Sequence, residues 1–174
     1  MNSPVDRDRL DHTLQQLNET RITRDDIDAV LNQLAERLEL DSLRLDENNT
    51  AELTVDDSIA LYLVYLTHQP GLIAAIPLPA RQSDRPEVLA QLLQANLSWE
   101  LTQGGIFGMV PGFKEPMLCR LMVITDRDRA QVDRLDRDLA GFVELATAWR
   151  RGLTRTGQVE SNPPPTGFVP GLRV

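Results

Sequence analysis

Apolar residues recur at steps of three and four in three segments of the chain, and this spacing predicts one buried face on each of three helices. The first helix starts at a capping box formed by Thr23 and Asp26. The second has Pro86 in its first turn, after a cap at Ser83 or Asp84. The third fits a helix lying on a sheet, the simpler interpretation, or a coiled coil. The expected buried faces are Ile27, Val30, Leu31, Leu34 and Leu38 for the first helix; Val88, Leu89, Leu92, Leu93 and Leu97 for the second; and, starting from about Asp128, Val132, Leu135, Leu139, Phe142, Ala146, Trp149 and Leu153 for the third.

Five shorter segments have the pattern of β-strands. The segment 51–55 alternates apolar and polar residues, as a strand with one buried face does, whereas 59–66 is apolar almost throughout, as a central strand is. Short turns join the first three strands, which favours antiparallel pairing because parallel neighbours need longer crossovers. The expected strands are 51–55, 59–66, 72–78, 104–110 and 117–124. The sequence therefore predicts an α+β fold, an antiparallel sheet flanked by helices in the order α-βββ-α-ββ-α.

The two ends of the chain differ from its middle. The first twenty residues are highly charged and place Leu10, Leu14 and Leu17 at helical spacing, which predicts a weakly amphipathic helix or a tail that orders only against another surface. Beyond Arg155, three consecutive prolines and few apolar residues favour a disordered or extended tail. We therefore divide the chain into an N-terminal extension (1–22), an α+β domain (23–155) and a proline-rich tail (156–174).

Composition and charge argue against some classes of binding partner. The 174 residues are 41% hydrophobic, enough for one domain with a real core, but only 5% are aromatic. Few aromatic rings and a net charge of -8 argue against nucleic-acid or membrane-surface binding, because an acidic surface repels phosphate groups. No apolar run approaches the ~20 residues of a membrane span, and no signal peptide opens the sequence. We therefore expect a cytoplasmic protein without membrane insertion.

No set of side chains predicts a catalytic or metal centre. His12 and His68 are the only histidines, and neither has the neighbours that a transition-metal site or a catalytic triad needs. The single cysteine, Cys119, lies in the apolar run 117–124 and is expected to be a buried strand thiol. Aspartates of the third helix alternate with arginines, which is typical of a salt-bridged surface. We therefore expect no enzymatic activity, no cofactor and no metal.

The segment 46–57 shares some features with a calcium-binding loop, since it places oxygen ligands at Asp46, Asn48 and Thr50. It has Ala51 where the sharp turn of such a loop needs glycine, and it lacks the glutamate that closes the site. The approach to a β-hairpin is therefore the better interpretation.

The segment 92–109, LLQANLSWELTQGGIFGM, joins the second helix to a strand through two adjacent glycines. Gly104 and Gly105 follow a helix and enter a strand, unlike a phosphate-binding loop, so we expect them to permit a tight turn and a close backbone approach. This segment, the acidic charge and the element order together resemble the class I chaperones of type III secretion, the Tir-chaperone family. The matching positions are Leu92, Leu93, Asn96, Leu97, Gly104, Gly105 and Gly108, within a resemblance that covers roughly 23–153.

The resemblance implies a homodimer without enzymatic activity. Such a protein binds the N-terminal region of a secreted effector in the bacterial cytoplasm and keeps it soluble and competent for secretion, and the secretion ATPase is a further implied partner. The effector wraps around the chaperone as extended chain, adding strand contacts and placing apolar side chains in pockets. The dimer interface is then expected at Leu93, Leu97, Trp99, Ile106, Phe107 and Met109. The effector-binding residues are expected at Leu38, Leu40, Leu43, Leu45 and Leu53.

Other interpretations stay open from the residues alone. Each of these apolar residues can instead belong to the core of the monomer. The chain can also be a dimeric α+β interaction or adaptor domain in another assembly, or a carboxylate-dependent hydrolase. Exposed apolar patches favour a chaperone, whereas a hydrolase needs a deep polar cleft with convergent carboxylates and an adaptor needs neither.

Overall fold

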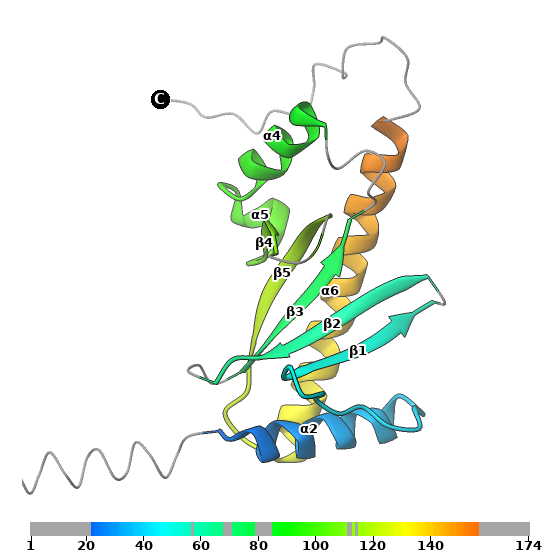
Figure 1. Ribbon diagram of the computed structural model, residues 1–174, viewed down its shortest axis with the longest axis vertical. Helices are drawn as coiled ribbons and strands as arrows, with labels where there is room; N and C mark the ends of the chain where they lie inside the picture. The colour runs from blue at the N-terminus through cyan, green and yellow to red at the C-terminus, as the bar shows by residue number, and fades with distance from the viewer. Residues whose placement is uncertain are drawn as a thin grey trace, which may run out of the picture.

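The computed structural model describes residues 22–56, 58–67, 71–78, 85–110, 113 and 115–156. These residues form a five-stranded sheet of antiparallel neighbours in the order β1-β2-β3-β5-β4. Helices α2 and α6 lie on one side of the strands, and α4 with the short α5 stands at one end (Figure 1). The elements are α2 (Arg24–Arg37), β1 (Thr50–Val55), β2 (Ile59–Tyr65), β3 (Gly71–Pro77), α4 (Pro86–Ala95), α5 (Trp99–Thr102), β4 (Ile106–Met109), β5 (Pro116–Val123) and α6 (Arg129–Thr156). The predicted fold class and element order are confirmed, with α5 added.

Helix α2 begins where its sequence predicts. The Thr23 hydroxyl accepts the N–H of Asp26 at 3.3 Å, and the Asp26 carboxylate accepts the N–H of Thr23 at 2.9 Å, which completes the capping box. The predicted face is buried at Ile27, Val30, Leu31 and Leu34. Leu38 was expected on this face, but it is the residue that ends the helix and its side chain is 40% exposed.

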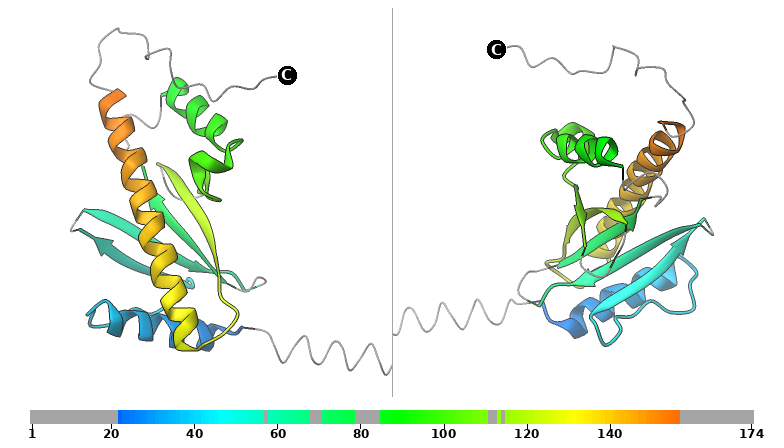
Figure 2. Two further views of the ribbon diagram at one scale, coloured as in Figure 1. Left: turned by 180° about the vertical axis from the view of Figure 1, so that it is seen from behind. Right: turned by 45° about the horizontal axis from the view of Figure 1, so that its top comes forward.

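Helix α6 supplies the longest part of the core. Its 28 residues run along the sheet rather than along a second long helix, so the simpler of the two predictions is correct (Figure 2). The predicted stripe is buried at Val132, Leu135, Leu139, Phe142, Ala146 and Leu153, with Trp149 partly buried. This single helix therefore ties both ends of the sheet together.

Helix α4 departs from its prediction at both ends. It starts after Arg85, which makes no side-chain capping bond, and the expected caps at 83 and 84 lie outside the described residues. It buries Val88, Leu92 and Ala95, whereas Leu89 is half-buried and Leu93 and Leu97 are exposed. The reason is that α4 packs mainly on β4 and α5, which leaves Leu93 and Leu97 facing solvent.

The two adjacent glycines have the two roles expected of them. Gly104 adopts a left-handed backbone with φ of 83°, which turns the chain out of α5. A Cβ at Gly105 would lie 3.1 Å from the carbonyl oxygen of Cys119, so a side chain there would push β5 away by a few tenths of an ångström. The strand itself begins at Ile106, two residues later than predicted.

Several predictions concern residues that lie outside the described ranges, and one prediction differs from the structure. Leu10, Leu14, Leu17, His12, His68 and the tail from 157 onward are outside the described residues. Cys119 is only half-buried, so the expected full burial is wrong, and this partial burial raises the pKa of its thiol. None of the helices in the described part is long and apolar enough to cross a membrane.

Candidate functional site

An apolar groove lies where the end of α2, the strand β1 and the middle of α6 meet. Its volume is ≈ 300 Å³, and every lining residue except Asp136 is apolar. We call it the β1 groove, and its lining is Leu38, Leu53, Val55, Leu61, Asp136, Leu139, Ala140 and Val143. Two of the five residues expected to bind an effector, Leu38 and Leu53, are therefore brought together.

The other three predicted effector-binding residues do not line this groove. Leu43 and Leu45 are buried in the core, so neither side chain is open to a partner in the described chain. The physical reason is that the backbone N–H of Leu45 donates to the Asp28 carboxylate at 2.9 Å, which holds this segment against α2. Leu40 is exposed but is not one of the residues that line the groove.

Strand β1 forms one edge of the sheet, beside the groove. The N–H of Thr50 donates to the Asp46 carboxylate at 2.9 Å, and the Thr50 carbonyl accepts the N–H of Asp46 at 2.8 Å. Thr50 therefore turns its backbone groups away from β2, and alternation along a strand turns those of Glu52 and Thr54 the same way. The edge thus presents two residues, each with one donor and one acceptor, to an added strand.

The same contacts explain the segment that shares features with a calcium loop. The Asp46 carboxylate accepts hydrogen bonds from the N–H groups of Thr50 and Asn48, and these bonds lower the pKa of Asp46. Asp46 therefore shapes the turn that enters β1, as the hairpin interpretation predicts. Within the described ranges, no group of three or more histidine, cysteine or acidic side chains is placed to hold a metal ion.

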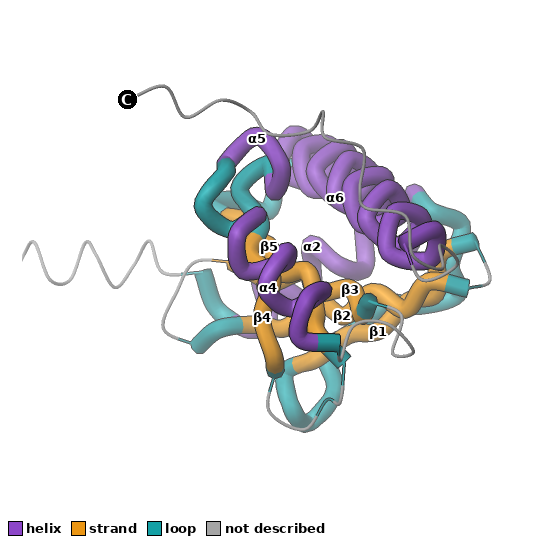
Figure 3. The backbone as a smooth tube through the Cα atoms, turned by 90° about the horizontal axis from the view of Figure 1, so that it is seen from above, coloured by secondary structure: helices purple, strands orange, loops and turns teal. Residues whose placement is uncertain are grey.

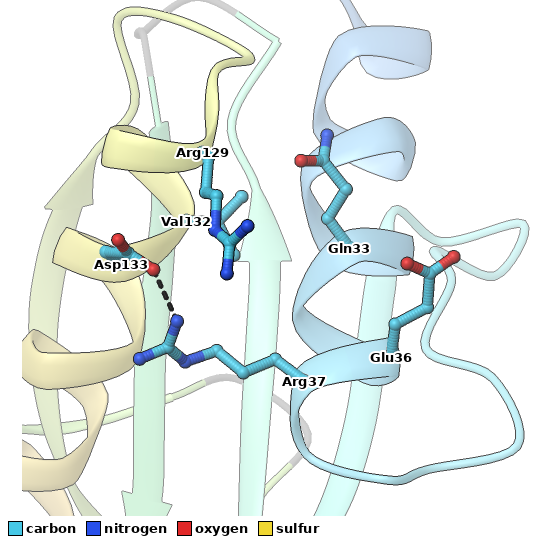
Figure 4. A pocket seen from close by; sticks show the side chains of 6 residues that line it. All are labelled: Gln33, Glu36, Arg37, Arg129, Val132 and Asp133. Atoms are coloured by element: carbon cyan, nitrogen blue, oxygen red, sulfur yellow. Dashed lines mark hydrogen bonds and ion pairs between the residues drawn. The ribbon is translucent and has the colours of Figure 1, made fainter.

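A polar cleft separates α2 from the start of α6, and Figure 4 shows Arg37 reaching across it toward Asp133. Arg37 bonds to Asp133 and, through Nε, to Asp136 at 2.6 Å. The aspartates of α6 were expected to pair on their own surface, but these two pair with α2 instead. Both carboxylates therefore face a guanidinium, which holds α2 against α6 and neutralises the charged end of the β1 groove.

A second group of exposed apolar side chains lies on α4, α5 and β4, with Ile106 and Met109 on opposite faces of β4. Five side chains of this unit are between 57% and 90% exposed, although all are large and apolar. We call it the α4–β4 surface, and it consists of Leu93, Leu97, Trp99, Ile106 and Met109. Leu93 and Met109 also line one cavity of ≈ 180 Å³. The structure thus exposes five of the six residues expected at a dimer interface.

The sixth, Phe107, belongs to the core of the chain. It is 4% exposed and its ring meets that of Trp149 edge to face, with centroids 4.7 Å apart. Trp149 in turn donates its indole N–H to the carbonyl of Leu101 at 3.1 Å. Because side chains alternate along a strand, Phe107 points away from the side on which Ile106 lies. Phe107 is therefore a core residue rather than an exposed one, although it lines the same cavity as Leu93 and Met109.

Sequence reasoning missed the role of Asn96. Its side-chain oxygen accepts the N–H of Phe107 at 2.7 Å, and its side-chain nitrogen donates to the Phe107 carbonyl at 2.9 Å. One amide group thus satisfies both backbone groups of a strand residue and fixes β4 to the end of α4. The available signal was an asparagine placed directly after the last turn of the helix.

Comparisons with known proteins agree with this architecture. Residues 29–150 match the model of the Tir chaperone protein (CesT) family. The chain is similar to the solved ExsC–ExsE complex, with 22% sequence identity and a TM-score of 0.64 over 75% of this chain and 95% of that one. It is also similar to the HopA1–SchA chaperone–effector complex, with 21% identity and a TM-score of 0.59 over 72% and 94%. At these identities the two structures show a shared fold. No curated protein matches the chain in sequence.

Proposed function

The chain belongs to the Tir chaperone protein (CesT) family, and on that premise we propose that it is a type III secretion chaperone. It binds the N-terminal region of a secreted effector in the bacterial cytoplasm, without catalysis, and keeps that region soluble and competent for secretion. The observation that carries the proposal is the apolar β1 groove beside an edge strand that has no second neighbour among the described residues. These two features suit a client held as extended chain.

Backbone pairing supplies the part of the binding that is independent of sequence. A client strand pairs with the outward donors and acceptors of Glu52 and Thr54, since Asp46 already occupies those of Thr50. The client strand therefore pairs with β1 over a short stretch, which cannot extend past Thr50 because the turn before β1 already bonds to that residue. Short pairing of this kind tolerates many client sequences.

The β1 groove supplies the part that depends on client side chains. Leu53 and Val55 point from β1 into the groove, so alternate side chains of an added strand reach the same side. A groove of ≈ 300 Å³ admits a large apolar side chain, and complete burial of such a side chain stabilises by about 1.5–3 kcal/mol. The client segment is therefore expected to place leucine, isoleucine or phenylalanine next to polar residues.

The groove is tested with two leucines that are exposed to a similar extent. Leu38→Glu places a charge in the groove, whereas Leu40→Glu places the same charge outside it. Affinity is measured by calorimetry for the N-terminal segment of a candidate secreted protein encoded beside the gene. We expect Leu38→Glu to weaken binding strongly and Leu40→Glu to leave it nearly unchanged. Equal affinities in the two variants would count against the groove.

The chaperone also forms a homodimer through the α4–β4 surface. Leu97 and Trp99 are exposed to water in the single chain, and burying them against a second copy would be favourable. Large apolar side chains of this kind are typical of the centre of an interface. Light scattering of the purified protein checks the mass. A dimer that captures no client would favour the adaptor hypothesis, and a monomer would remove this part of the proposal.

The secretion ATPase is the further partner of this proposal. A chaperone that only stores its client needs no second partner, whereas one that delivers the client must be recognised at the secretion machinery. Co-purification of the ATPase with the loaded complex, compared with the empty chaperone, tests the interaction. Recovery of the ATPase in neither sample would leave storage as the role.

A further inference from the structure

The two strands at the edges of the sheet, β1 and β4, each have backbone groups that point away from the sheet. Along an antiparallel strand, the N–H and C=O groups of alternate residues point to the neighbouring strand, and those of the residues between them point outward. Figure 3 shows α4 next to β4, with β1 at the opposite edge of the sheet. The two edges differ in how far the chain itself occupies these outward groups.

The contacts of β5 determine which residues of β4 point outward. The carbonyl of Pro116 accepts the N–H of Leu78, the residue after β3, at 2.9 Å. The next residue of β5, Met117, therefore directs its backbone groups to β4, where it is paired with Gly108. By the same alternation, the backbone groups of Phe107, next to Gly108, point away from β5.

The outward groups of Phe107 are both occupied by the residue that follows α4. The N–H of Phe107 donates to the side-chain oxygen of Asn96 at 2.7 Å, and the carbonyl accepts the side-chain nitrogen at 2.9 Å. Two residues earlier, the N–H of Gly105 donates to the carbonyl of Thr102 in α5 at 2.8 Å. Met109, at the far end of β4, also points outward, and no described residue bonds to its backbone there. The middle of the β4 edge is therefore closed by the chain itself.

The β1 edge is open by comparison. Glu52 and Thr54 each direct one N–H and one carbonyl outward, and within the described part of the chain these groups have no partner. Both edges have an apolar cavity beside them, since Leu93 and Met109 line the cavity of ≈ 180 Å³ next to β4 and the β1 groove measures ≈ 300 Å³. An apolar cavity therefore does not distinguish the two edges, whereas the outward backbone groups do.

We propose that Asn96 closes β4 to added strands and thereby directs an extended client to β1, so that each chain holds one client strand. This role of Asn96 rests on the client binding proposed above. A strand added at β1 gains a partner for the outward groups of Glu52 and Thr54. A strand added at β4 must first break both bonds between Asn96 and Phe107, so it replaces two hydrogen bonds and adds none. Asn96 is therefore a specificity-determining residue, although it touches no client.

The side chain of Asn96 suits this role because its amide group imitates the backbone of a neighbouring strand. It offers an acceptor and a donor in one plane, the same two groups that a paired residue offers to its partner. An aspartate of the same shape accepts but does not donate when ionised, and an alanine does neither. Substitution by aspartate or alanine therefore removes one bond or both without adding volume.

Hydrogen exchange of the unmodified full chain gives the first test. The probe is the N-terminal segment of a candidate secreted protein encoded beside the gene, and amide exchange is measured with and without it. We expect the segment to slow exchange several-fold at Glu52 and Thr54 and to leave Phe107 and Met109 unchanged. Slower exchange at Met109 would show a strand at β4 and overturn the closure. Binding without slower exchange at Glu52 and Thr54 would contradict the pairing with β1 on which both proposals rest.

Two variants of Asn96 then test the residue itself. Asn96→Ala frees both outward groups of Phe107, whereas the matched control Asn96→Asp frees the carbonyl but still accepts the N–H. We expect the client segment to slow exchange of the Phe107 amide several-fold in Asn96→Ala and to leave it unchanged in Asn96→Asp. Calorimetry should also give more bound segments per chain in the alanine variant alone. If the segment protects Glu52 and Thr54 but not Phe107 in Asn96→Ala, the role of Asn96 is overturned and the proposed function stands.

Discussion

Helices α2 and α4 have similar apolar patterns but opposite surroundings. On α2 the predicted stripe is buried against the sheet and α6, with Leu31 and Leu34 fully enclosed. On α4 only part of the stripe is buried, and Leu93 and Leu97 face outward. Both helices separate apolar from polar residues, so the pattern alone does not distinguish them.

The two helices differ in how many other elements of the same chain cover their apolar stripes. Helix α2 lies between the sheet and the long helix α6, whereas α4 packs mainly on β4 and the short α5. A helical stripe therefore predicts a covered face, but the covering can come from another molecule. For α4 we propose a second copy of the chain.

The largest contrast between the two regions is expected in stability. Phe142→Ala removes a fully buried ring from the core, and the free energy of unfolding should fall by about 3–5 kcal/mol. Leu97→Ala changes a side chain that is 90% exposed, and in the dissociated chain it should change stability by less than about 0.5 kcal/mol. Urea denaturation at low protein concentration measures both. Similar losses of unfolding free energy in the two variants would contradict the distinction between a buried core and an exposed α4.

The next contrast concerns assembly. Leu93→Asp with Leu97→Asp places two charges on the α4–β4 surface, and centrally buried interface residues typically contribute about 2 kcal/mol or more. The dissociation constant of the dimer should therefore rise by roughly 30-fold or more. Gln91→Asp with Gln94→Asp adds the same charge at exposed positions of the same helix. Sedimentation should detect dissociation only in the leucine variant. Equal effects would indicate charge repulsion rather than a specific interface.

A smaller effect is expected where α4 is joined to β4. Asn96→Ala removes both side-chain bonds to the backbone of Phe107, and such a loss costs about 1–3 kcal/mol. Exchange of the Phe107 amide hydrogen should accelerate as well. Gln94→Ala, on the exposed side of the same helix, is the control. An unchanged exchange rate in Asn96→Ala would mean that packing alone holds β4.

The smallest effect is a dependence on pH at the start of α2. Hydrogen bonds from the backbone and side chain of Thr23, with a weaker contribution from Arg127, hold the pKa of Asp26 below its ordinary 3.8. This stabilisation is present above pH 3.8 and is lost as the pH falls through the lowered pKa. Asp26→Asn should therefore lower stability at neutral pH by less than about 1 kcal/mol. Thermal unfolding at several pH values should show the difference disappearing in acid, and a constant difference would contradict it.

The fold could be predicted because each element carries its own local signal. The capping box fixed the start of α2, alternation identified β1, and the two glycines marked the turn into β4. These signals depend on residues close in sequence, and the structure confirms them within a few residues.

The candidate site was predicted less completely because exposure depends on distant contacts. Leu38, Leu43 and Leu45 are all leucines between α2 and β1, yet only Leu38 lines the groove. The burial of Leu45 follows from a bond to Asp28 in the preceding helix, and that of Phe107 from the ring of Trp149. No local pattern contains those pairings.

Hydrogen exchange with and without a client segment tests the central claim most directly. Added strand pairing should slow exchange of the outward-facing amides of Glu52 and Thr54, because they gain acceptors from the client. The amides of Leu53 and Val55 already face β2 and should change less. Client binding with selective protection at Glu52 and Thr54 is the predicted result. Client binding with no added protection along β1 would contradict the account.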